Sequence, residues 1–327
     1  MPRAKKHLSG KRKSEIAKKR AHEQAMAKVA ALADGMEQVD FTYQAARHER
    51  VWLLDSLGRF YDEKWLDDIL RLVKGGKEAN VYQCLAHSSV TGLENAYIAA
   101  KVYRPRQFRN LRNDALYREG RDHLDADGCV IIDDRMLRAI SKRTGFGMQL
   151  SHASWIEHEV KTMDTLHEAG ADVPQVFASG HNAILMSYIG DADMAAPTLN
   201  SISLDRDEAQ PLFQRVLRNI EIMLANHLVH GDLSAYNILY WDGSITLIDF
   251  PQVIDPEVNR SAFRVFERDL VRVCEYFAHQ GVRSNPRKLA AELWTAHGHR
   301  LAAEVHPANL DADDEADRAY WKNISQR

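Results

Sequence analysis

The sequence predicts an α+β fold, in which a small antiparallel sheet with one long helix precedes a mainly helical part. Short runs rich in β-branched and aromatic residues, between residues 71 and 103 and again between 173 and 190, are separated by turn residues and predict strands. Apolar side chains recur at helical spacing over 206–227. Asp242-Gly243, between two further apolar runs, predicts a tight hairpin.

The first part of the chain predicts helices and then strands. An Ala-, Lys- and Glu-rich segment over 14–34 favours a helix, and the apolar run over 51–72, at mixed spacing, favours short helices. The segment 71–86 predicts a strand, a glycine-rich turn and a second strand, and 96–103 predicts a third strand. Residues 104–150 are polar and rich in arginine, and so long a stretch without periodicity indicates a mobile or functional insertion.

The elements expected after the insertion are, in order, a helix over 154–168, strands over 173–178 and 183–190, a loop over 197–203, and helices near 257–279 and 286–303. Glycine and proline mark two of the helix ends. Gly170 stands where the first of these helices would stop, and Pro286 stands where the last would begin.

Charge is distributed unevenly along the chain, although the net charge is only −3. Residues 1–20 contain nine Lys or Arg and one acidic residue, and the rest of the chain contains 34 basic and 45 acidic residues. A basic tail on an acidic body indicates contact with a polyanion, of which RNA is the obvious example. A solvated tail that keeps the protein soluble is an equal alternative.

Three widely separated cysteines, Cys84, Cys129 and Cys274, show neither CxxC pairing nor Cys/His metal spacing. We therefore expect no disulfide framework and no structural zinc site. The N-terminus lacks the apolar core of a signal peptide, and no run of 18 apolar residues predicts a membrane span. These features predict a protein without a membrane partner, in a reducing, cytoplasmic setting.

The most distinctive segment contains three oxygen-bearing side chains at close spacing. Asp232 and Asn237 lie five residues apart in HGDLSAYN, and Asp249 ends the apolar strand after the predicted hairpin. Phosphoryl transfer needs such a set: a carboxylate that orients or deprotonates the attacking hydroxyl, and hard oxygen ligands for Mg²⁺. Each residue alone would more simply cap a turn. The joint pattern, HGDxxxxN followed at short range by IDF, is specific.

This pattern resembles the protein-kinase superfamily, and more closely the RIO family of atypical serine/threonine protein kinases. The similar segments are GKEANVY (76–82), AAKVY (99–103), LMSYIG (185–190), HGDLSAYN (230–237) and IDFPQ (248–252). The resemblance implies a two-lobed, protein-kinase-like fold with a small antiparallel sheet in the N-lobe and a reduced, mainly helical C-lobe.

On this basis the chain divides into three parts. These are a basic, flexible or helical tail over 1–45, an N-lobe over 46–190 with a long insertion near 104–150, and a reduced C-lobe over 191–327. The N-terminal winged helix of one RIO subgroup is not recognised. The chain therefore looks nearer to the other subgroup.

The resemblance implies a catalytic role for Asp232 and metal-binding roles for Asn237 and Asp249. The residue matching Asp249 is also associated in RIO proteins with an aspartyl-phosphate intermediate. A carboxylate nucleophile is chemically reasonable. The residues of this chain do not separate that role from metal binding.

Lys101 resembles the strand lysine that contacts the α- and β-phosphates of ATP. A point charge on a strand beside a phosphate suits that task. Its expected ion-pair partner is a glutamate on the helix over 154–168. Glu159 is favoured for this role, and Glu157 stays open as an alternative because spacing alone does not decide between them.

The nucleotide is expected to contact two further segments. Met186 resembles the gatekeeper, and the backbone of Ser187 and Ile189 would hydrogen-bond adenine. The phosphates would lie under a turn whose backbone N–H groups suit anionic oxygens. Its residues are Lys74, Gly75, Gly76, Lys77, Glu78, Ala79 and Asn80.

The chain departs from common protein kinases in three places. The glycine-rich turn lacks the full GxGxxG, and Pro251 follows Asp249-Phe250 where a typical kinase has glycine. The segment after Asp249 is short and contains no APE-like motif. The helices that usually dock peptide substrates are therefore expected to be missing, a truncation that RIO kinases share.

The leading interpretation is a RIO-like serine/threonine protein kinase that uses ATP and Mg²⁺, with Mn²⁺ as an alternative ion, and that phosphorylates a protein substrate and itself. An ATPase switch in ribosome or RNA assembly would use the same residues, with the basic tail in contact with RNA or a ribosomal particle. A small-molecule phosphotransferase is a third interpretation, against which GKEANVY and IDFPQ argue. A non-catalytic scaffold is the weakest, because no catalytic position is lost.

Overall fold

The computed structural model of the chain describes residues 41–104, 121–125, 127–180 and 182–299. The chain forms two compact units. Unit 1 consists of Met1–Arg112, His123–Asp164 and Pro174–Ala196, and unit 2 consists of Asn113–Asp122, Thr165–Val173 and Pro197–Arg327. The helix expected over 14–34 and part of the insertion, residues 105–120, lie outside the described residues.

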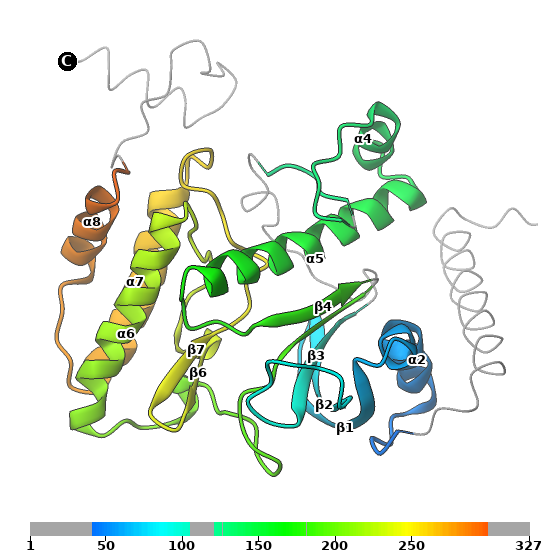
Figure 1. The fold of residues 1–327 in the computed structure, drawn as a ribbon. Helices are drawn as coiled ribbons and strands as arrows, with labels where there is room; N and C mark the ends of the chain where they lie inside the picture. Colours follow the sequence, from blue (N-terminus) through cyan, green and yellow to red (C-terminus); the bar gives the residue numbers. More distant parts are fainter. Residues whose placement is uncertain (1–40, 105–120, 126, 181, 300–327) are drawn as a thin grey trace, which may run out of the picture. The chain divides into compact units, whose positions relative to one another are not determined.

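Unit 1 is built on a five-stranded antiparallel sheet with the strand order β1-β2-β3-β5-β4 (Figure 1). The α+β prediction with a small antiparallel sheet is thereby confirmed. The strands are β1 Leu66–Gly75, β2 Ala79–Ala86, β3 Tyr97–Tyr103, β4 Val176–Gly180 and β5 Ala183–Ser187. The helices that accompany the sheet are α2 Arg47–Asp62, α4 Asp134–Ser141 and α5 Gly145–Glu168.

The central strand β3 sends side chains to both faces of this sheet, because successive residues of a strand point in opposite directions. Ile98 and Val102 are fully buried in a core cluster that also contains apolar side chains of α2, β1 and β2. Lys101 and Tyr103 therefore face the other side. There the Tyr103 ring packs against Trp155 of α5, with ring centroids 5.0 Å apart.

The prediction that residues 51–72 form short helices was wrong over its second half. The helix α2 ends at Asp62, and Lys64 follows with a φ of 61°. Residues 66–72 belong to the edge strand β1. Three register irregularities between β1 and β2 interrupt the alternation of buried and exposed side chains, so the sequence of β1 lacks the period of two that marks a strand.

The prediction that the long helix begins at residue 154 was also wrong, because α5 begins at Gly145. Thr144 caps this end: its Oγ1 accepts from the Gly147 N–H at 3.0 Å, and its carbonyl accepts from the Met148 N–H at 2.8 Å. Two glycines in the first turn lower the intrinsic helix propensity there, and the cap compensates for them.

Among its described residues, unit 2 combines three α-helices and two short 3-10 helices with a two-stranded hairpin. Its elements are η2 Leu199–Ser201, α6 Arg206–Ala225, η3 Ala235–Asn237, β6 Ile238–Trp241, β7 Ser244–Leu247, α7 Ala262–His279 and α8 Pro286–Ala296. The hairpin prediction is confirmed: Asp242 and Gly243 both have positive φ, 46° and 74°, as a type I′ turn requires.

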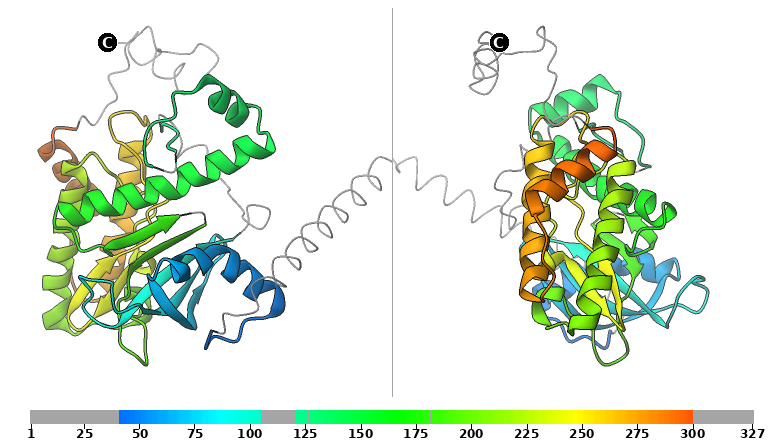
Figure 2. Two further views of the ribbon diagram at one scale, coloured as in Figure 1. Left: turned by 45° about the vertical axis from the view of Figure 1, so that its right-hand side comes forward. Right: turned by 90° about the vertical axis from the view of Figure 1, so that its left-hand side faces the viewer.

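The three helices pack through aromatic side chains, and Figure 2 shows them together in its right-hand view. Phe213 of α6 lies 5.1 Å from Phe277 of α7, measured between ring centroids. Phe266 of α7 lies 5.3 Å from Trp294 of α8. Within the described ranges, no helix is long and apolar enough to cross a membrane.

A polar network ties the hairpin of unit 2 to α6. The Asp172 carboxylate accepts two hydrogen bonds from Arg215, both 2.8 Å, and one from Asn219 at 2.7 Å. The Asp172 carbonyl accepts from the N–H of Leu247, the last residue of β7, at 2.8 Å. Burial alone would raise the pKa of Asp172, but the hydrogen bonds from Arg215 and Asn219 outweigh it and hold that pKa below its ordinary value.

We expect Asp172→Asn to lower the free energy of unfolding at neutral pH by about 1.5–3 kcal/mol, because hydrogen bonds to a charged group are lost. A lowered pKa in the folded state gives stability that is present above the unfolded-state pKa and is lost as pH falls through the folded-state value. The deficit of the variant should therefore shrink below about pH 4. Urea unfolding of both proteins across pH measures it. The exposed Glu221→Gln on α6 is the control, and a deficit independent of pH would contradict the ionic account.

Candidate active site

Lys101 and Glu159 form a buried ion pair in unit 1. The Nζ of Lys101 lies 2.5 Å from Oε1 of Glu159, and the two side chains are only 9% and 1% exposed. The hydroxyl of Tyr103 donates a hydrogen bond to the other carboxylate oxygen, Oε2. A buried carboxylate is costly unless it is paired and hydrogen-bonded. Lys101 of β3 supplies the ion pair, and Tyr103 of the same strand supplies the hydrogen bond.

The structure distinguishes the two glutamates that the sequence left open. Lys101 pairs with Glu159, whereas Glu157 lies half-buried near Ser179 of β4. Burial is the main cause that raises the pKa of Glu157, and the negative charge of Asp164 adds to the shift. Glu157 thus lies among other acids and not beside the lysine.

The glycine-rich turn between β1 and β2 is organised by Asn80, which is 5% exposed. Its Oδ1 accepts from the Gly76 N–H at 3.4 Å and from Arg104 at 3.1 Å. A Cβ on Gly76 would lie 2.5 Å from the carbonyl oxygen of Ala79, so the turn requires glycine there. The other predicted phosphate-contacting residues lie on the same turn: Lys74 and Gly75 end β1, Lys77 and Glu78 follow, and Ala79 begins β2.

The three residues predicted to contact adenine lie at and after the end of β5. Met186 is 8% exposed and pairs with Ala99 of β3. The N–H of Ser187 donates to the carbonyl of Gln175, and the carbonyl of Ile189 accepts from the N–H of Ala196, each at 2.9 Å. The Ser187 carbonyl and the Ile189 N–H take no part in these two hydrogen bonds.

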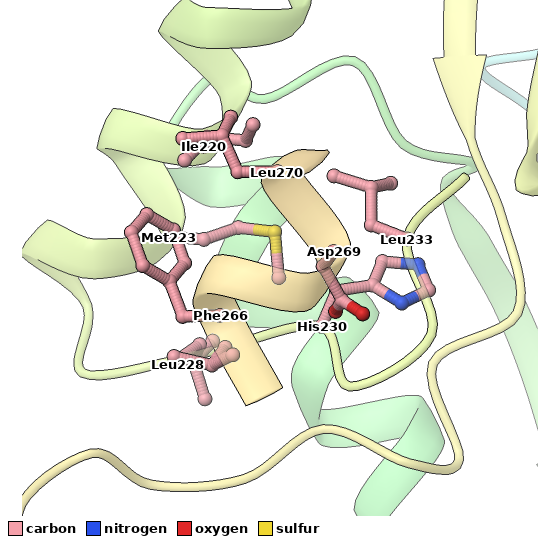
Figure 3. Close-up of a pocket in the computed structure, with 9 residues that line it drawn as sticks. Ile220, Met223, Leu228, His230, Leu233, Phe266, Asp269 and Leu270 are labelled. Carbon is pink, nitrogen blue, oxygen red and sulfur yellow. The ribbon is translucent and has the colours of Figure 1, made fainter. Parts of the chain in front are cut away.

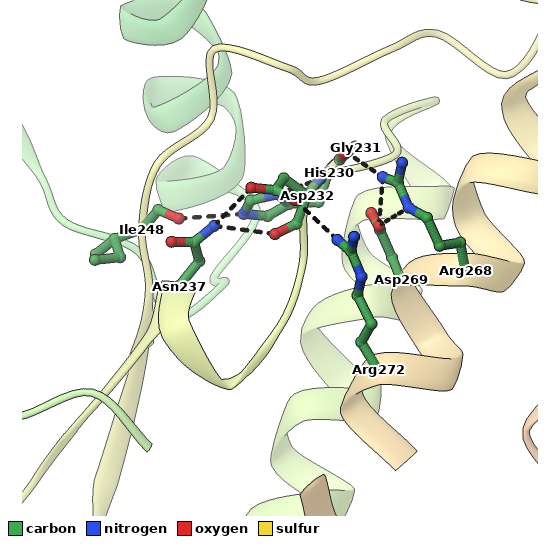
Figure 4. Close-up of polar contacts among 8 residues, drawn as sticks. All are labelled: His230, Gly231, Asp232, Asn237, Ile248, Arg268, Asp269 and Arg272. Carbon is green, nitrogen blue, oxygen red and sulfur yellow. Dashed lines mark hydrogen bonds and ion pairs between the residues drawn. The ribbon is translucent and has the colours of Figure 1, made fainter. Parts of the chain in front are cut away.

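In unit 2, the loop from His230 to Asn237 leads directly into β6, and Figure 4 shows its polar contacts. His230 satisfies both of its ring nitrogens in one tautomer: Nε2 lies 3.2 Å from the Ile248 carbonyl, and Nδ1 accepts from the Asp232 N–H at 3.3 Å. Gly231 has a φ of 84°, and a Cβ there would collide with the carbonyl of Gln252. Position 231 therefore requires glycine, because any side chain there would meet the backbone of Gln252.

Asn237 fixes the course of the loop around Asp232. Its Nδ2 donates to the Asp232 carbonyl at 3.0 Å and lies 3.5 Å from the carboxylate Oδ2. Because the Asn237 amide nitrogen is turned toward Asp232, the Asn237 Oδ1 points away from Asp232. The Ile248 N–H donates to the Asn237 carbonyl at 3.0 Å, which extends the hairpin register by one residue. Asp249 therefore follows directly on the residue paired with Asn237.

Asp249 adopts a left-handed backbone conformation, with a φ of 74°. Such a conformation is uncommon for a residue other than glycine, and residues of this kind cluster at ligand and catalytic sites. The next residue, Phe250, is buried at 1% exposure, and its ring lies 5.0 Å from that of His230. Phe250 thus anchors the turn that follows Asp249.

Asn237 and Asp249 fit a magnesium ion by the chemistry of their donors. Both offer oxygen atoms, which are the ligands that Mg²⁺ prefers. Within the described residues, no group of three or more His, Cys, Asp or Glu side chains could hold a metal. Mg²⁺ often uses only one or two protein ligands together with water and substrate phosphates, so a pair of ligands is sufficient.

Three residues of α7 lie beside the loop, and the sequence interpretation missed all of them. Arg268 donates to the Gly231 carbonyl and, at 2.8 Å, to Asp269 Oδ1. Arg272 donates to Asp232 Oδ1 at 2.9 Å. Burial raises the pKa of Asp269 above its ordinary value, although His230 and Arg268 oppose the shift. Helical spacing identified α7, but the sequence contains no local signal for contacts between segments so far apart along the chain.

Asp269 and His230 are the polar members of an otherwise apolar hollow beneath the loop (Figure 3). The lining residues are Ile220, Met223, Leu228, Val229, His230, Leu233, Phe266, Asp269 and Leu270. They come from α6, from the segment 228–233 that leads into the loop, and from α7. Apolar packing therefore holds the underside of the loop, while Asp232 lies on its exposed side with a side chain that is 42% exposed.

Arg121 was likewise missed. Its guanidinium donates to the carbonyls of Pro251 and Val253, in the segment directly after Asp249. Arg121 lies in the predicted insertion, far earlier in the chain. A residue of the insertion thus constrains the backbone beside the predicted metal ligand.

The ion pair generates a prediction about stability. Lys101→Met leaves the Glu159 carboxylate buried without a cation, which should lower the free energy of unfolding by about 3–5 kcal/mol. The double variant Lys101→Met/Glu159→Gln removes the stranded charge and should recover part of this loss. Chemical denaturation of the three proteins measures both effects. Equal losses for the single and double variants would show that the charge is not the cause.

Comparison with known proteins gives a family match and several relatives. Residues 80–289 match the family described as RIO domain. The RIO-type serine/threonine-protein kinase Rio1 of Thermoplasma acidophilum is 30% identical over 135 residues, which are 41% of this chain and 69% of that protein. The serine/threonine-protein kinase rio1 of Schizosaccharomyces pombe is 28% identical over 214 residues, 65% of this chain but only 38% of that protein.

The comparison also includes a RIO3 relative and a Rio2 structure. The serine/threonine-protein kinase RIO3 of Mus musculus is 32% identical over 167 residues, 50% of this chain and 30% of that protein. Among solved structures, the Rio2 kinase–ADP/Mg²⁺–phosphoaspartate complex of Chaetomium thermophilum has a TM-score of 0.48 and 19% identity, over 83% of this chain and 76% of that one. The family match covers more than half of this chain, and the Thermoplasma protein is matched over more than two thirds of its length. The chain therefore belongs to the RIO domain family.

Proposed function

We propose that this chain is an ATP- and Mg²⁺-dependent serine/threonine protein kinase of the RIO type, which transfers the γ-phosphate of ATP to a protein hydroxyl and to itself. The observation that carries the proposal is the arrangement at the end of the β6–β7 hairpin. There the exposed carboxylate of Asp232 lies beside the side-chain amide of Asn237, and Asp249 directly follows the residue that pairs with Asn237 in the hairpin. Relatives named serine/threonine-protein kinases support the same activity.

The residues of unit 2 would act on the acceptor and the metal. Asp232 would accept the proton of the acceptor hydroxyl while the hydroxyl oxygen forms a bond to the γ-phosphorus of ATP. The bond between the γ-phosphorus and the oxygen that bridges to the β-phosphate would break at the same time, which releases ADP. Asn237 and Asp249 would hold Mg²⁺. When bound, the ion supplies charge neutralisation for the phosphates.

The residues of unit 1 would bind the nucleotide. Lys101, held by Glu159, would contact the α- and β-phosphates as a fixed point charge. The turn over 74–80 would cover the phosphates with backbone N–H groups. The carbonyl of Ser187 and the N–H of Ile189 would bond adenine beside Met186.

An ATPase switch in ribosome or RNA assembly is the second candidate, with water in place of the hydroxyl. Two features of the sequence favour it: no APE-like motif follows Asp249, and the segment 1–20 carries nine Lys or Arg. In this case the basic segment would bind RNA or a ribosomal particle in the cytoplasm. A small-molecule phosphotransferase is weakened by the RIO family match.

Incubation with γ-labelled ATP and Mg²⁺ tests the proposed function. We expect label on serine or threonine of the protein, reduced at least a hundredfold in Asp232→Asn because the proton acceptor is lost, roughly as for removal of a general base. Glu221→Gln should behave as wild type. Mainly free phosphate from wild type would favour the ATPase switch. A hydroxylamine-labile label that maps to Asp249 would assign that residue a nucleophilic role.

Metal binding by Asn237 has its own test. We expect Asn237→Ala to raise the Mg²⁺ concentration for half-maximal turnover roughly tenfold or more. Removing a residue that only contacts a metal ligand already lowers metal affinity about tenfold to a hundredfold, and loss of a ligand itself should cost at least as much. Mn²⁺ binding in the presence of ADP, followed by electron paramagnetic resonance, should weaken to a similar extent. The exposed Asn200→Ala is the matched control. Unchanged Mn²⁺ affinity in Asn237→Ala would rule out the ligand role.

A further inference from the structure

We propose that Arg272 is a positioning residue for Asp232, holding its carboxylate in the orientation that receives the proton of the acceptor hydroxyl. The inference rests on the proposed function. Arg272 lies on α7, well after Asp232 in the chain, and its Nη1 donates to Asp232 Oδ1 at 2.9 Å (Figure 4).

The contact leaves one carboxylate oxygen for chemistry. Oδ1 is engaged by the guanidinium of Arg272. Oδ2 lies 3.5 Å from the amide nitrogen of Asn237, at the limit of a weak hydrogen bond. Within the part of the chain that the structure describes, Arg272 is the one charged partner of Asp232. Without it, the carboxylate would have no strong contact to set its rotation about the Cα–Cβ and Cβ–Cγ bonds.

Comparison with Arg268, one helical turn earlier, separates positioning from structural support. Arg268 bonds the Gly231 carbonyl and the buried Asp269, and so connects the loop backbone to the helix. Arg272 bonds the carboxylate of Asp232, and both side chains of this pair are about two fifths exposed. An ion pair so exposed adds little to folding stability. Its consequence is the orientation of Asp232.

Orientation matters at this position because phosphoryl transfer depends on placement. A misplacement of about 1 Å can lower turnover roughly a hundredfold. The support beneath the loop fixes the backbone of Asp232 through His230 and Arg268. The side chain extends beyond that support toward solvent, and Arg272 provides the remaining constraint.

The test compares Arg272→Met and Arg272→Lys with Arg264→Met, a control at an exposed arginine of the same helix. We expect Arg272→Met to lower kcat for phosphate transfer roughly tenfold to a hundredfold. The KM for ATP and the unfolding midpoint should stay those of wild type. Arg272→Lys should retain part of the rate, and added guanidinium ion should restore part of it to Arg272→Met but not to Asp232→Asn. Adding Arg272→Met to Asp232→Asn should lower turnover no further.

Two results would overturn the inference. One is wild-type kcat in Arg272→Met. The other is a loss of kcat accompanied by a lower unfolding midpoint and no response to guanidinium ion, which would indicate a structural role. Nitrogen-15 NMR of the Arg272 guanidinium, without nucleotide, checks the ion pair independently of activity: rotation should be restricted in wild type and free in Asp232→Asn. Restricted rotation in a wild type that transfers no phosphate would refute the proposed function, whereas free rotation in an active wild type would refute the inference alone.

Discussion

Both units depend on an acidic side chain that is buried away from water and paired with a basic one. In unit 1 the Glu159 carboxylate is 1% exposed and is held by Lys101 and Tyr103. In unit 2 Asp269 is 4% exposed beside Arg268. An uncompensated charge at such depth would cost several kcal/mol. Each carboxylate therefore requires its basic partner. Lys101 belongs to β3, and Arg268 contacts the backbone of the loop that carries Asp232.

The loop of unit 2 combines buried side chains that support it with exposed side chains at the proposed site. His230, Asn237 and Asp269 are all buried, and they direct the loop by hydrogen bonds to its backbone or by packing beneath it. The side chains of Asp232 and Arg272, by contrast, are exposed. Such an arrangement leaves the Asp232 carboxylate accessible while the backbone that carries it is held in place, as the proton acceptor that we propose would require.

Membership of the RIO domain family agrees with the motif interpretation and with the expected subgroup, since the curated relatives carry the names RIO1 and RIO3. The chain nevertheless spans little more than a third of the Schizosaccharomyces pombe protein that it matches. The region that matches the family includes strands β2 to β5, the hairpin and the loop between α6 and β6.

The sequence by itself determined the features whose signals are local. Asp242-Gly243 specified a type I′ hairpin because few residues tolerate positive φ, and the spacing of Asp232, Asn237 and Asp249 marked the predicted acid/base and metal residues. Only the tertiary structure decided the start of β1, where register irregularities remove the alternation, and the pairing of Lys101 with Glu159 instead of Glu157. It alone revealed Arg121, Arg268, Asp269 and Arg272 as neighbours of the loop and hairpin. Turn chemistry acts between adjacent residues and is written in the sequence, whereas contacts between distant parts of the chain arise only when helices and strands pack.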